Sequence, residues 1–227
     1  MNFQGFPKMA RLSREVIITE KIDGTNACIV IGAIPKLSEG DPDWPSPHQP
    51  ERIAYWYGMD GSAWGIWAGS RTRWVTPEND NYGFAKWVKD HVEELKLLGS
   101  GRHFGEWWGQ GIQRNYGLKE KRFSLFNPIR WHLKGDKARC ISVNERGEPK
   151  MQQPIPKCVG LVPTISSGIF TSELVDSALN ILRKSGSNAV PGFMNPEGIV
   201  IYHTAGNVSF KKTLEKDSAP KNISMVA

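Results

Sequence analysis

The sequence lacks the features that mark membrane-spanning, secreted and disulfide-stabilised proteins. No apolar run approaches the ~20 residues that a membrane span needs, and residues 1–14 contain no apolar core of a signal peptide. The only three cysteines, Cys28, Cys140 and Cys158, lie far apart and match no metal-binding spacing. We therefore expect reduced thiols, no membrane association and a cytoplasmic location, in the host cell if the gene is phage-encoded.

Acidic residues are too few to balance the basic ones. The 227 residues carry a formal net charge of +6, and their 39% hydrophobic content suits one globular domain. The segment from Arg102 to Arg139 contains nine basic residues and only three acidic ones. Such clustering is typical of proteins that bind polyphosphates such as nucleic acid. A solvated basic surface is the alternative interpretation.

The segment from Thr19 to Asn26 is the densest candidate site. Residues 16–19 and 27–31 read as strands, and the Asp23-Gly24 pair between them predicts a tight hairpin whose glycine takes a positive φ. Lys21, at the mouth of this hairpin, would be held on rigid backbone. Lysine acts as a covalent nucleophile once its ammonium has lost a proton. A solvated lysine beside a turn is the alternative, because a lone Lys-x-Asp-Gly also occurs by chance.

The other expected elements follow from periodicity and from turn residues. Residues 33–52, with five prolines, predict a surface loop, and the residues after position 213 predict a polar tail. The remaining predictions are two short strands within 53–73, a helix that starts at Thr76-Pro77-Glu78 and ends before Gly99, strands around Glu106 and from Arg122 to Trp131, one or two strands within 135–162, and a helix capped by Thr171 or Ser172 that ends before Gly186.

The C-terminal part predicts a second hairpin, with strands at 196–203 and 207–212. If its Ala-Gly turn has two residues, Val200 faces Lys211 and Ile199 faces Lys212 across the ladder. Glu197 would then lie at the same open end of the hairpin as both lysines. A carboxylate beside two ammonium groups can hold a phosphate and its metal ion.

Three further positions are candidates for ligand contacts. Arg71 leaves a predicted strand end, where a guanidinium could bind a phosphate. Glu106, flanked by glycines on a strand, would need a partner if buried, and ligand hydroxyls or metal-bound waters could provide one. Phe123 and Phe126 could stack on a base, although at least one of them should belong to the core.

Taken in order, these segments resemble the covalent nucleotidyltransferases, which include RNA ligases, DNA ligases and mRNA-capping enzymes. The matching segments cover almost the whole chain: Glu20-Lys21-Ile22-Asp23-Gly24-Thr25-Asn26, Ser70-Arg71-Thr72, Phe104-Gly105-Glu106, Phe123 to Phe126, Glu197-Gly198-Ile199-Val200 and Phe210-Lys211-Lys212. Asn26 and the segment Trp-Trp-Gly-Gln-Gly after Glu106 look most like the RNA ligase branch that includes phage nick-sealing enzymes.

The resemblance implies a role for each matching residue. Lys21 would become linked to AMP, Asp23 would orient the attacking hydroxyl or the leaving group, and Lys211 and Lys212 would hold phosphates. Mg²⁺, or Mn²⁺ in its place, would be held by Glu106 and Glu197, largely through water. The nucleotide contacts implied are those of Glu20, Lys21, Ile22, Asn26, Arg71, Glu106, Phe123, Phe126, Glu197, Lys211 and Lys212.

The resemblance also implies the fold and the reaction. The fold would be an α+β nucleotidyltransferase (ATP-grasp-like) fold with two packed, largely antiparallel sheets and flanking helices, forming one domain over residues 1–227. The reaction would be ATP-dependent sealing of 5′-phosphate and 3′-hydroxyl ends of RNA or RNA/DNA strands. We expect no C-terminal OB domain, so an accessory protein could replace a second domain.

Two departures from the pattern and three alternatives remain at this point. Lys211 and Lys212 are adjacent, whereas the family usually spaces these lysines by one residue, and the chain stops soon after them. A DNA ligase or capping-type enzyme would use the same motifs. The second alternative is an inactive nucleic-acid-binding module of the same fold. The third is a nucleotidyltransferase that acts on a protein or small molecule.

Overall fold

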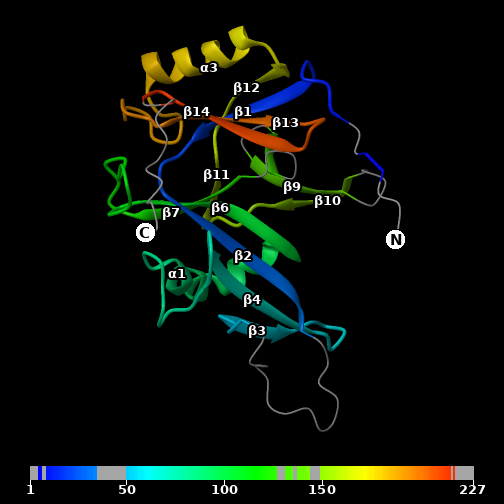
Figure 1. The fold of residues 1–227 in the computed structure, drawn as a ribbon. Helices are drawn as coiled ribbons and strands as arrows, with labels where there is room; N and C mark the ends of the chain where they lie inside the picture. Colours follow the sequence, from blue (N-terminus) through cyan, green and yellow to red (C-terminus); the bar gives the residue numbers. More distant parts are fainter. Residues whose placement is uncertain are drawn as a thin grey trace, which may run out of the picture. The chain divides into compact units, whose positions relative to one another are not determined.

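The chain folds into two compact units, and one of them is built from both ends of the sequence. In the computed structural model, which describes residues 5–6, 9–34, 50–126, 131–134, 137–143, 149–215 and 217, unit 1 comprises residues 1–22 and 162–227, and unit 2 comprises residues 23–161. The chain is coloured along its length in Figure 1.

Unit 1 is a four-stranded antiparallel sheet with a helix. The strand order is β12-β1-β13-β14, so that the first strand lies between strands from the end of the chain. Thr171 caps the helix by accepting a hydrogen bond from the Leu174 amide at 3.1 Å, as predicted. The bounds are β1 (Glu15–Lys21), β12 (Thr164–Ile169), α3 (Ser172–Ser185), β13 (Gly198–His203) and β14 (Val208–Thr213).

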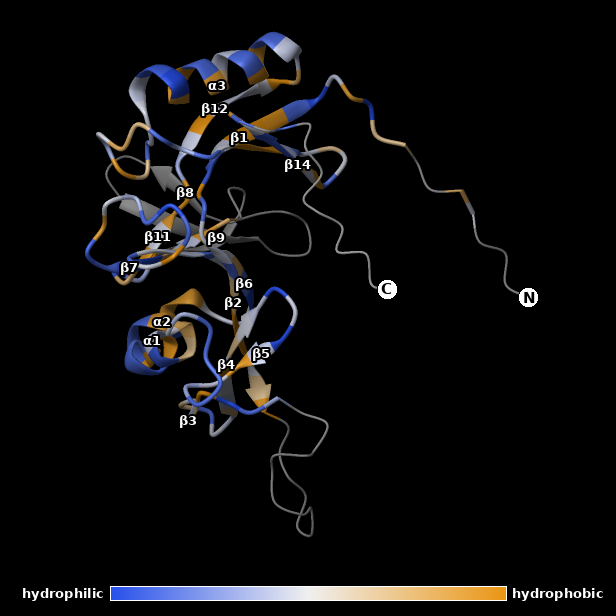
Figure 2. Ribbon diagram, turned by 60° about the vertical axis from the view of Figure 1, so that its left-hand side comes forward, coloured by the Kyte–Doolittle hydropathy of each residue, from blue (hydrophilic) through white to orange (hydrophobic). Residues whose placement is uncertain are grey.

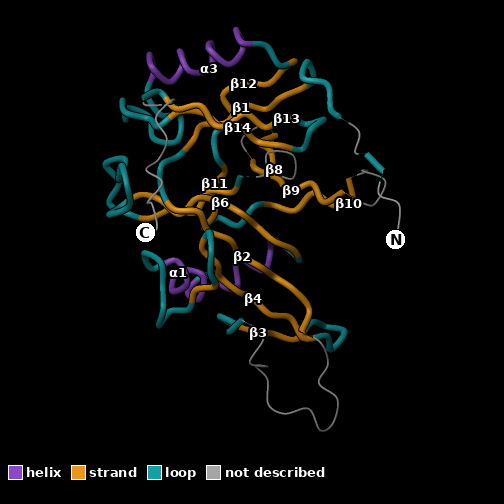
Figure 3. The backbone as a smooth tube through the Cα atoms, viewed as in Figure 1, coloured by secondary structure: helices purple, strands orange, loops and turns teal. Residues whose placement is uncertain are grey.

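Unit 2 contains a seven-stranded sheet in the order β11-β7-β6-β2-β4-β3, with β5 paired to β4, and only β11 runs parallel to its neighbour. Its elements are β2 (Thr25–Ile34), β3 (Ala54–Tyr57), β4 (Ala63–Ser70), β5 (Trp74–Val75), α1 (Phe84–Asp90), α2 (Val92–Leu95), the 3₁₀ helix η1 (Lys96–Leu98), β6 (Gly101–Gly109), β7 (Lys121–Leu125) and β11 (Val159–Leu161). A separate antiparallel sheet, β10-β9-β8, is formed by β8 (Trp131–Lys134), β9 (Lys137–Val143) and β10 (Pro149–Pro154). Figure 3 distinguishes strands from helices.

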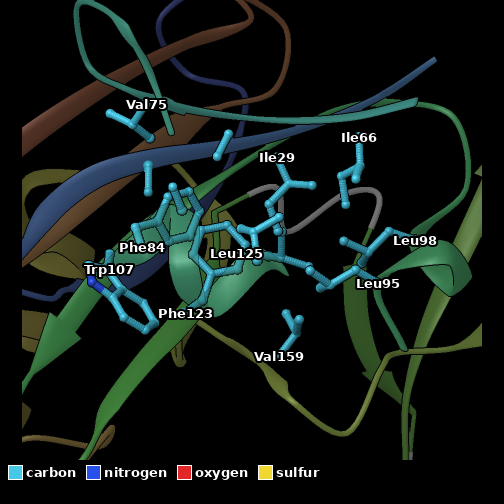
Figure 4. Packing of buried hydrophobic residues seen from close by; sticks show 14 of the residues in the cluster. Ile29, Ile66, Val75, Phe84, Leu95, Leu98, Trp107, Phe123, Leu125 and Val159 are labelled. Atoms are coloured by element: carbon cyan, nitrogen blue, oxygen red, sulfur yellow. The ribbon is translucent and has the colours of Figure 1, made fainter. Parts of the chain in front are cut away.

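Each unit buries its own apolar core. In unit 2, one face of the large sheet packs against α1 and α2, and Phe84, Trp107 and Phe123 form an aromatic cluster there with ring centroids 5.3–5.5 Å from Phe84 (Figure 4). In unit 1, alternate residues of β1 and β13 pack against Val175 and Leu179 of α3. Burying one such side chain contributes roughly 1.5–3 kcal/mol. Figure 2 shows the mixed hydropathy of α3 that this one-sided packing requires.

These observations confirm the mixed α+β fold with largely antiparallel sheets. Among the described residues, every helix is too short or too polar to cross a bilayer. The loop predicted for 33–52 falls largely on residues 35–49, which lie outside the described residues, and β2 extends to Ile34. The predicted tail likewise lies mostly outside them. The region 135–162 forms three strands rather than one or two.

The predicted hairpin around Asp23-Gly24 is wrong. β1 pairs with β12 and β13, whereas β2 pairs with β4 and β6, so the turn carries the chain from one sheet to another. Gly24 is also absent from the positive-φ glycines of the described chain. A glycine is required at position 24 for a different reason: a Cβ there would lie 2.5 Å from the carbonyl oxygen of Trp107.

The helix predicted to start at Thr76 begins instead at Phe84 and is interrupted at His91. The Thr76 hydroxyl accepts a hydrogen bond from the Asn79 amide and so closes a turn. The Asp80 carboxylate accepts hydrogen bonds from the backbone amides of Ala85 and Lys86, in the first turn of the helix. Polar residues that compete for backbone amides thus delay the helix by two turns.

Candidate active site

Lys21, the predicted nucleophile, is the last residue of β1 and forms an ion pair with Glu197. The Lys21 Nζ and Glu197 Oε2 atoms are 2.5 Å apart, and the side chains are 22% and 13% exposed. Both residues belong to unit 1, and Lys21 lies opposite Gly198 in the β1–β13 register. The structure therefore holds the candidate amine at a strand end, partly open to solvent, beside one carboxylate.

Gly198 makes this arrangement sterically feasible. Its φ is +156°, and a Cβ there would lie 2.3 Å from the Lys212 carbonyl oxygen. Side chains rarely adopt this backbone conformation, and no rotamer could relieve contact with backbone atoms. Close approach of β13 to β14 thus requires glycine directly after Glu197.

The predicted register of the C-terminal hairpin is confirmed, and it separates the two lysines. Val200 lies opposite Lys211 and Ile199 opposite Lys212. Thr19 is aligned with Val200, so Lys211 lies on the same face of the sheet as Thr19 and Lys21, because alternate side chains share a face. Lys212 lies on the face that packs on α3.

The contacts of the two lysines agree with this division. The Lys212 Nζ atom is 3.2 Å from the Asp176 carboxylate of α3, with both side chains substantially exposed. Lys211 is exposed and makes no hydrogen bond or ion pair with any other described residue. Of these two lysines, Lys211 therefore offers its ammonium group on the face that carries the candidate nucleophile.

The carboxylate of Glu20, next to Lys21, makes its hydrogen bonds within unit 1. The side chain is 1% exposed and accepts hydrogen bonds from the Ser187 hydroxyl at 2.6 Å and from the amides of Asn188 and Ala189 at 2.8 and 2.9 Å. Its role is to fasten the loop after α3 to β1. The predicted nucleotide contact of Glu20 could therefore involve only its backbone. Ile22 is buried, at 4% exposure.

Unit 2 gathers a second group of predicted residues at one end of its large sheet. Glu106 on β6 is 9% exposed and accepts a hydrogen bond from the Gly24 amide at 3.0 Å. Asn26 lies directly opposite Glu106 across the β2–β6 ladder. Since β4 ends at Ser70, opposite Ala27, Arg71 leaves the sheet at the same end. It is exposed.

The two candidate phenylalanines lie on opposite faces of this sheet. Phe123 is 0% exposed and packs in the aromatic cluster with Phe84 and Trp107. Phe126 follows β7, is partly exposed and donates its amide to the Phe104 carbonyl. By alternation it shares the face of Ser124, which is opposite Glu106. Phe126 is therefore the one available to a base.

Asp23, the first residue of unit 2, is held by two residues that the sequence patterns did not reveal. Its backbone amide donates to the Tyr116 hydroxyl at 2.8 Å, and its Oδ2 atom is 3.1 Å from Arg114 Nε. Both partners come from the connection between β6 and β7. The sequence signal there was two glycines and one asparagine, residue types that favour left-handed backbone but do not say what the loop contacts.

Each unit holds one of the two predicted metal-binding carboxylates, Glu197 in unit 1 and Glu106 in unit 2. Across the described ranges, no three His, Cys, Asp or Glu side chains gather into a direct metal-binding cluster. Mg²⁺ usually retains several waters and needs only one or two carboxylates together with substrate phosphates. Either carboxylate by itself is therefore compatible with Mg²⁺ or Mn²⁺ bound largely through water.

The chain matches the family model described as RNA ligase over residues 14–214. No curated protein matches it. Similar solved structures include Naegleria gruberi RNA ligase variants with ATP and Mn (TM-score 0.44, 18% identity, 89% of this chain and 50% of that chain) and with AMP and Mn (TM-score 0.44, 18% identity, again 89% and 50%). The chain thus spans about half the length of these ligases.

Proposed function

Because the chain belongs to the RNA ligase family, we propose that it is an ATP-dependent RNA ligase that joins 5′-phosphate and 3′-hydroxyl ends through a lysyl-AMP intermediate. The observation that carries this proposal is the arrangement in unit 1. Lys21 is paired with Glu197 at 2.5 Å, and Lys211 stands on the same face of the sheet. An amine, a proton acceptor and a phosphate-binding cation are what nucleotidyl transfer to lysine needs.

In the first step, the Lys21 amine attacks the α-phosphorus of ATP. A nitrogen–phosphorus bond forms, the bond to the bridging oxygen breaks, and pyrophosphate leaves. The ammonium must lose a proton beforehand, and the Glu197 carboxylate is the acceptor within hydrogen-bond distance. Lys211 would neutralise negative charge on the phosphates.

In the second and third steps, AMP passes to the RNA 5′-phosphate, and the 3′-hydroxyl then displaces AMP to seal the strand. Asp23 would orient the attacking hydroxyl or the leaving group. We propose that Asn26, Arg71, Glu106 and the backbone of Glu20 and Ile22 bind the nucleotide, with Phe126 stacked on the base. Mg²⁺ or Mn²⁺, held through water by Glu106 and Glu197, would supply positive charge to the phosphates.

The test is incubation of the purified protein with α-³²P-ATP and Mg²⁺, followed by a denaturing gel. We expect a labelled band at the mass of the protein, which Lys21→Ala loses and Lys184→Ala, a control at an exposed position of α3, retains. Label in Lys21→Ala would refute the assignment of the nucleophile. Label from GTP or NAD but not from ATP would favour another enzyme of this superfamily.

The acceptor is tested separately with nicked duplexes that carry a 5′-phosphate. We expect an RNA nick to be sealed faster than a DNA nick. Preferential sealing of DNA would favour the DNA ligase alternative. Failure to form any protein–nucleotide adduct with ATP, GTP or NAD would contradict the ligase proposal and favour a binding module.

A further inference from the structure

The connection between β6 and β7 is held in an unusual backbone conformation. Three of its non-glycine residues, Gln113, Asn115 and Tyr116, have φ values of +44°, +60° and +54°. Left-handed backbone is uncommon for residues with bulky side chains and costs free energy. A loop that keeps three such residues must be fixed by other contacts.

Those contacts are present within unit 2. Ile112 and Tyr116 are buried, at 0% and 2% exposure. The Tyr116 ring packs edge-on against Trp108, with centroids 5.0 Å apart, and the Asn115 side chain accepts a hydrogen bond from the Gly111 amide at 3.1 Å. The loop is therefore a rigid platform, and its side chains are presented in fixed positions.

The platform contacts Asp23 through two different groups. The Tyr116 hydroxyl accepts the Asp23 amide at 2.8 Å, which fixes the backbone, and the Arg114 guanidinium lies 3.1 Å from the carboxylate, which fixes the side chain. Arg114 and Asp23 are 24% and 27% exposed. The Arg114 Nε atom that faces the carboxylate is itself buried, so the contact holds the Asp23 side chain in a defined place.

We propose that Arg114 and Tyr116 are positioning residues, which hold Asp23 in the orientation that strand sealing requires. This inference rests on the proposed ligase function and on the role of Asp23 in it. The alternative for Arg114, a direct contact with an RNA phosphate, predicts different results in the experiment below.

The experiment is a double-mutant cycle on separated reaction steps. Protein–AMP formation is measured with ATP, and the last step is measured as sealing of nicked RNA that already carries AMP on its 5′-phosphate, without ATP. Arg114→Ala should slow the same step as Asp23→Asn, by about 5- to 50-fold. In the Asp23→Asn background, Arg114→Ala should have almost no further effect.

Two further variants keep the test independent of folding defects. Tyr116→Phe retains the ring on Trp108 and removes the acceptor hydroxyl, so it should slow the same step with an unchanged melting temperature. Lys96→Ala removes another ion pair of unit 2, in which Lys96 is 27% and its partner Glu93 is 84% exposed, and it should leave every step unchanged. Arg114→Lys retains the charge without the planar guanidinium and should recover only part of the rate.

Several results would overturn the inference. Additive effects of Arg114→Ala and Asp23→Asn would mean that Arg114 acts without Asp23. A decrease of about one in the salt slope of RNA binding in Arg114→Ala would indicate a direct phosphate contact instead. Changes in melting temperature alone would indicate a purely structural role. A wild-type protein inactive in both steps would refute the ligase function itself, and this inference with it.

Discussion

Lys211 and Lys212 lie on opposite faces of the unit 1 sheet, and this difference predicts different effects of their substitution. Both substitutions to alanine remove one positive charge from neighbouring positions of β14, so their long-range electrostatic effects are closely matched. They differ in the face of the sheet affected. Lys211 shares the face of Lys21, whereas Lys212 is paired with Asp176 of α3. We expect Lys211→Ala to impair formation of lysyl-AMP and Lys212→Ala to spare it.

The magnitudes follow from the contacts that each change removes. If Lys211 donates one hydrogen bond to a phosphate, its loss costs about 1.5–3 kcal/mol, which corresponds to a rate decrease of about 10- to 150-fold. Lys212 and Asp176 are 41% and 61% exposed, and such a pair is worth about 0.2–1 kcal/mol of stability. Lys212→Ala should therefore lower the melting temperature slightly and change the rate less than about twofold.

The assay is the single-turnover rate of protein–AMP formation at saturating ATP, with thermal unfolding measured on the same samples. Asp176→Asn is the matched control, since it breaks the Lys212 ion pair from the other side and should reproduce the effect of Lys212→Ala. Equal loss of rate in Lys211→Ala and Lys212→Ala, or a larger loss in Lys212→Ala, would refute the assignment of faces.

Three further predictions concern stability and reactivity. Gly198→Ala should lower the free energy of unfolding in urea by about 1–3 kcal/mol, because alanine would be strained at this φ and would clash with backbone atoms. Gly168→Ala is the control and should leave stability unchanged, since its Cβ would meet nothing closer than 3.6 Å. Equal stabilities of the two variants would contradict the packing argument. Phe123→Ala should lower the free energy of unfolding by about 3–5 kcal/mol, because it truncates a core side chain. Phe126→Ala should raise the KM for ATP and leave stability unchanged. The reverse pattern would exchange the roles assigned to the two rings. Burial raises the pKa of Cys158 to about 12, so little of this thiol is ionised at pH 8. Cys158 should therefore react slowly with iodoacetamide in the native protein and quickly after unfolding, as measured by peptide mapping. Rapid labelling of the native protein would show that the thiol is not shielded.

The local parts of the fold could be predicted from the sequence, whereas the partners of the strands could not. The hairpin of β13 and β14 and its register followed from one turn and two apolar runs, and the structure confirms them. The Asp23-Gly24 turn carried an equally strong hairpin signal but joins two sheets. A turn motif specifies local backbone only, and the choice of neighbouring strand depends on tertiary packing.

The same distinction applies to the candidate site. Motif order was sufficient to select Lys21 and Glu197, which the structure brings into contact across 176 residues. Adjacent lysines could not be ranked before a sheet with a packed face had been established. Arg114 and Tyr116 were missed because their partner, Asp23, is distant in sequence and the loop has no hydrophobic period.

The origin of unit 1 in both ends of the sequence has a consequence for biosynthesis. Lys21 leaves the ribosome early, but Glu197 follows 176 residues later, a delay of about 10–35 seconds at 5–20 residues per second. Unit 2, which is continuous, can fold during that interval, while β1 waits for both of its neighbouring strands. A nascent or truncated chain therefore carries the lysine without its carboxylate and without Lys211. Under the proposed function, nucleotide transfer would begin only once translation has supplied β13 and β14, and the nascent chain would not consume ATP before then.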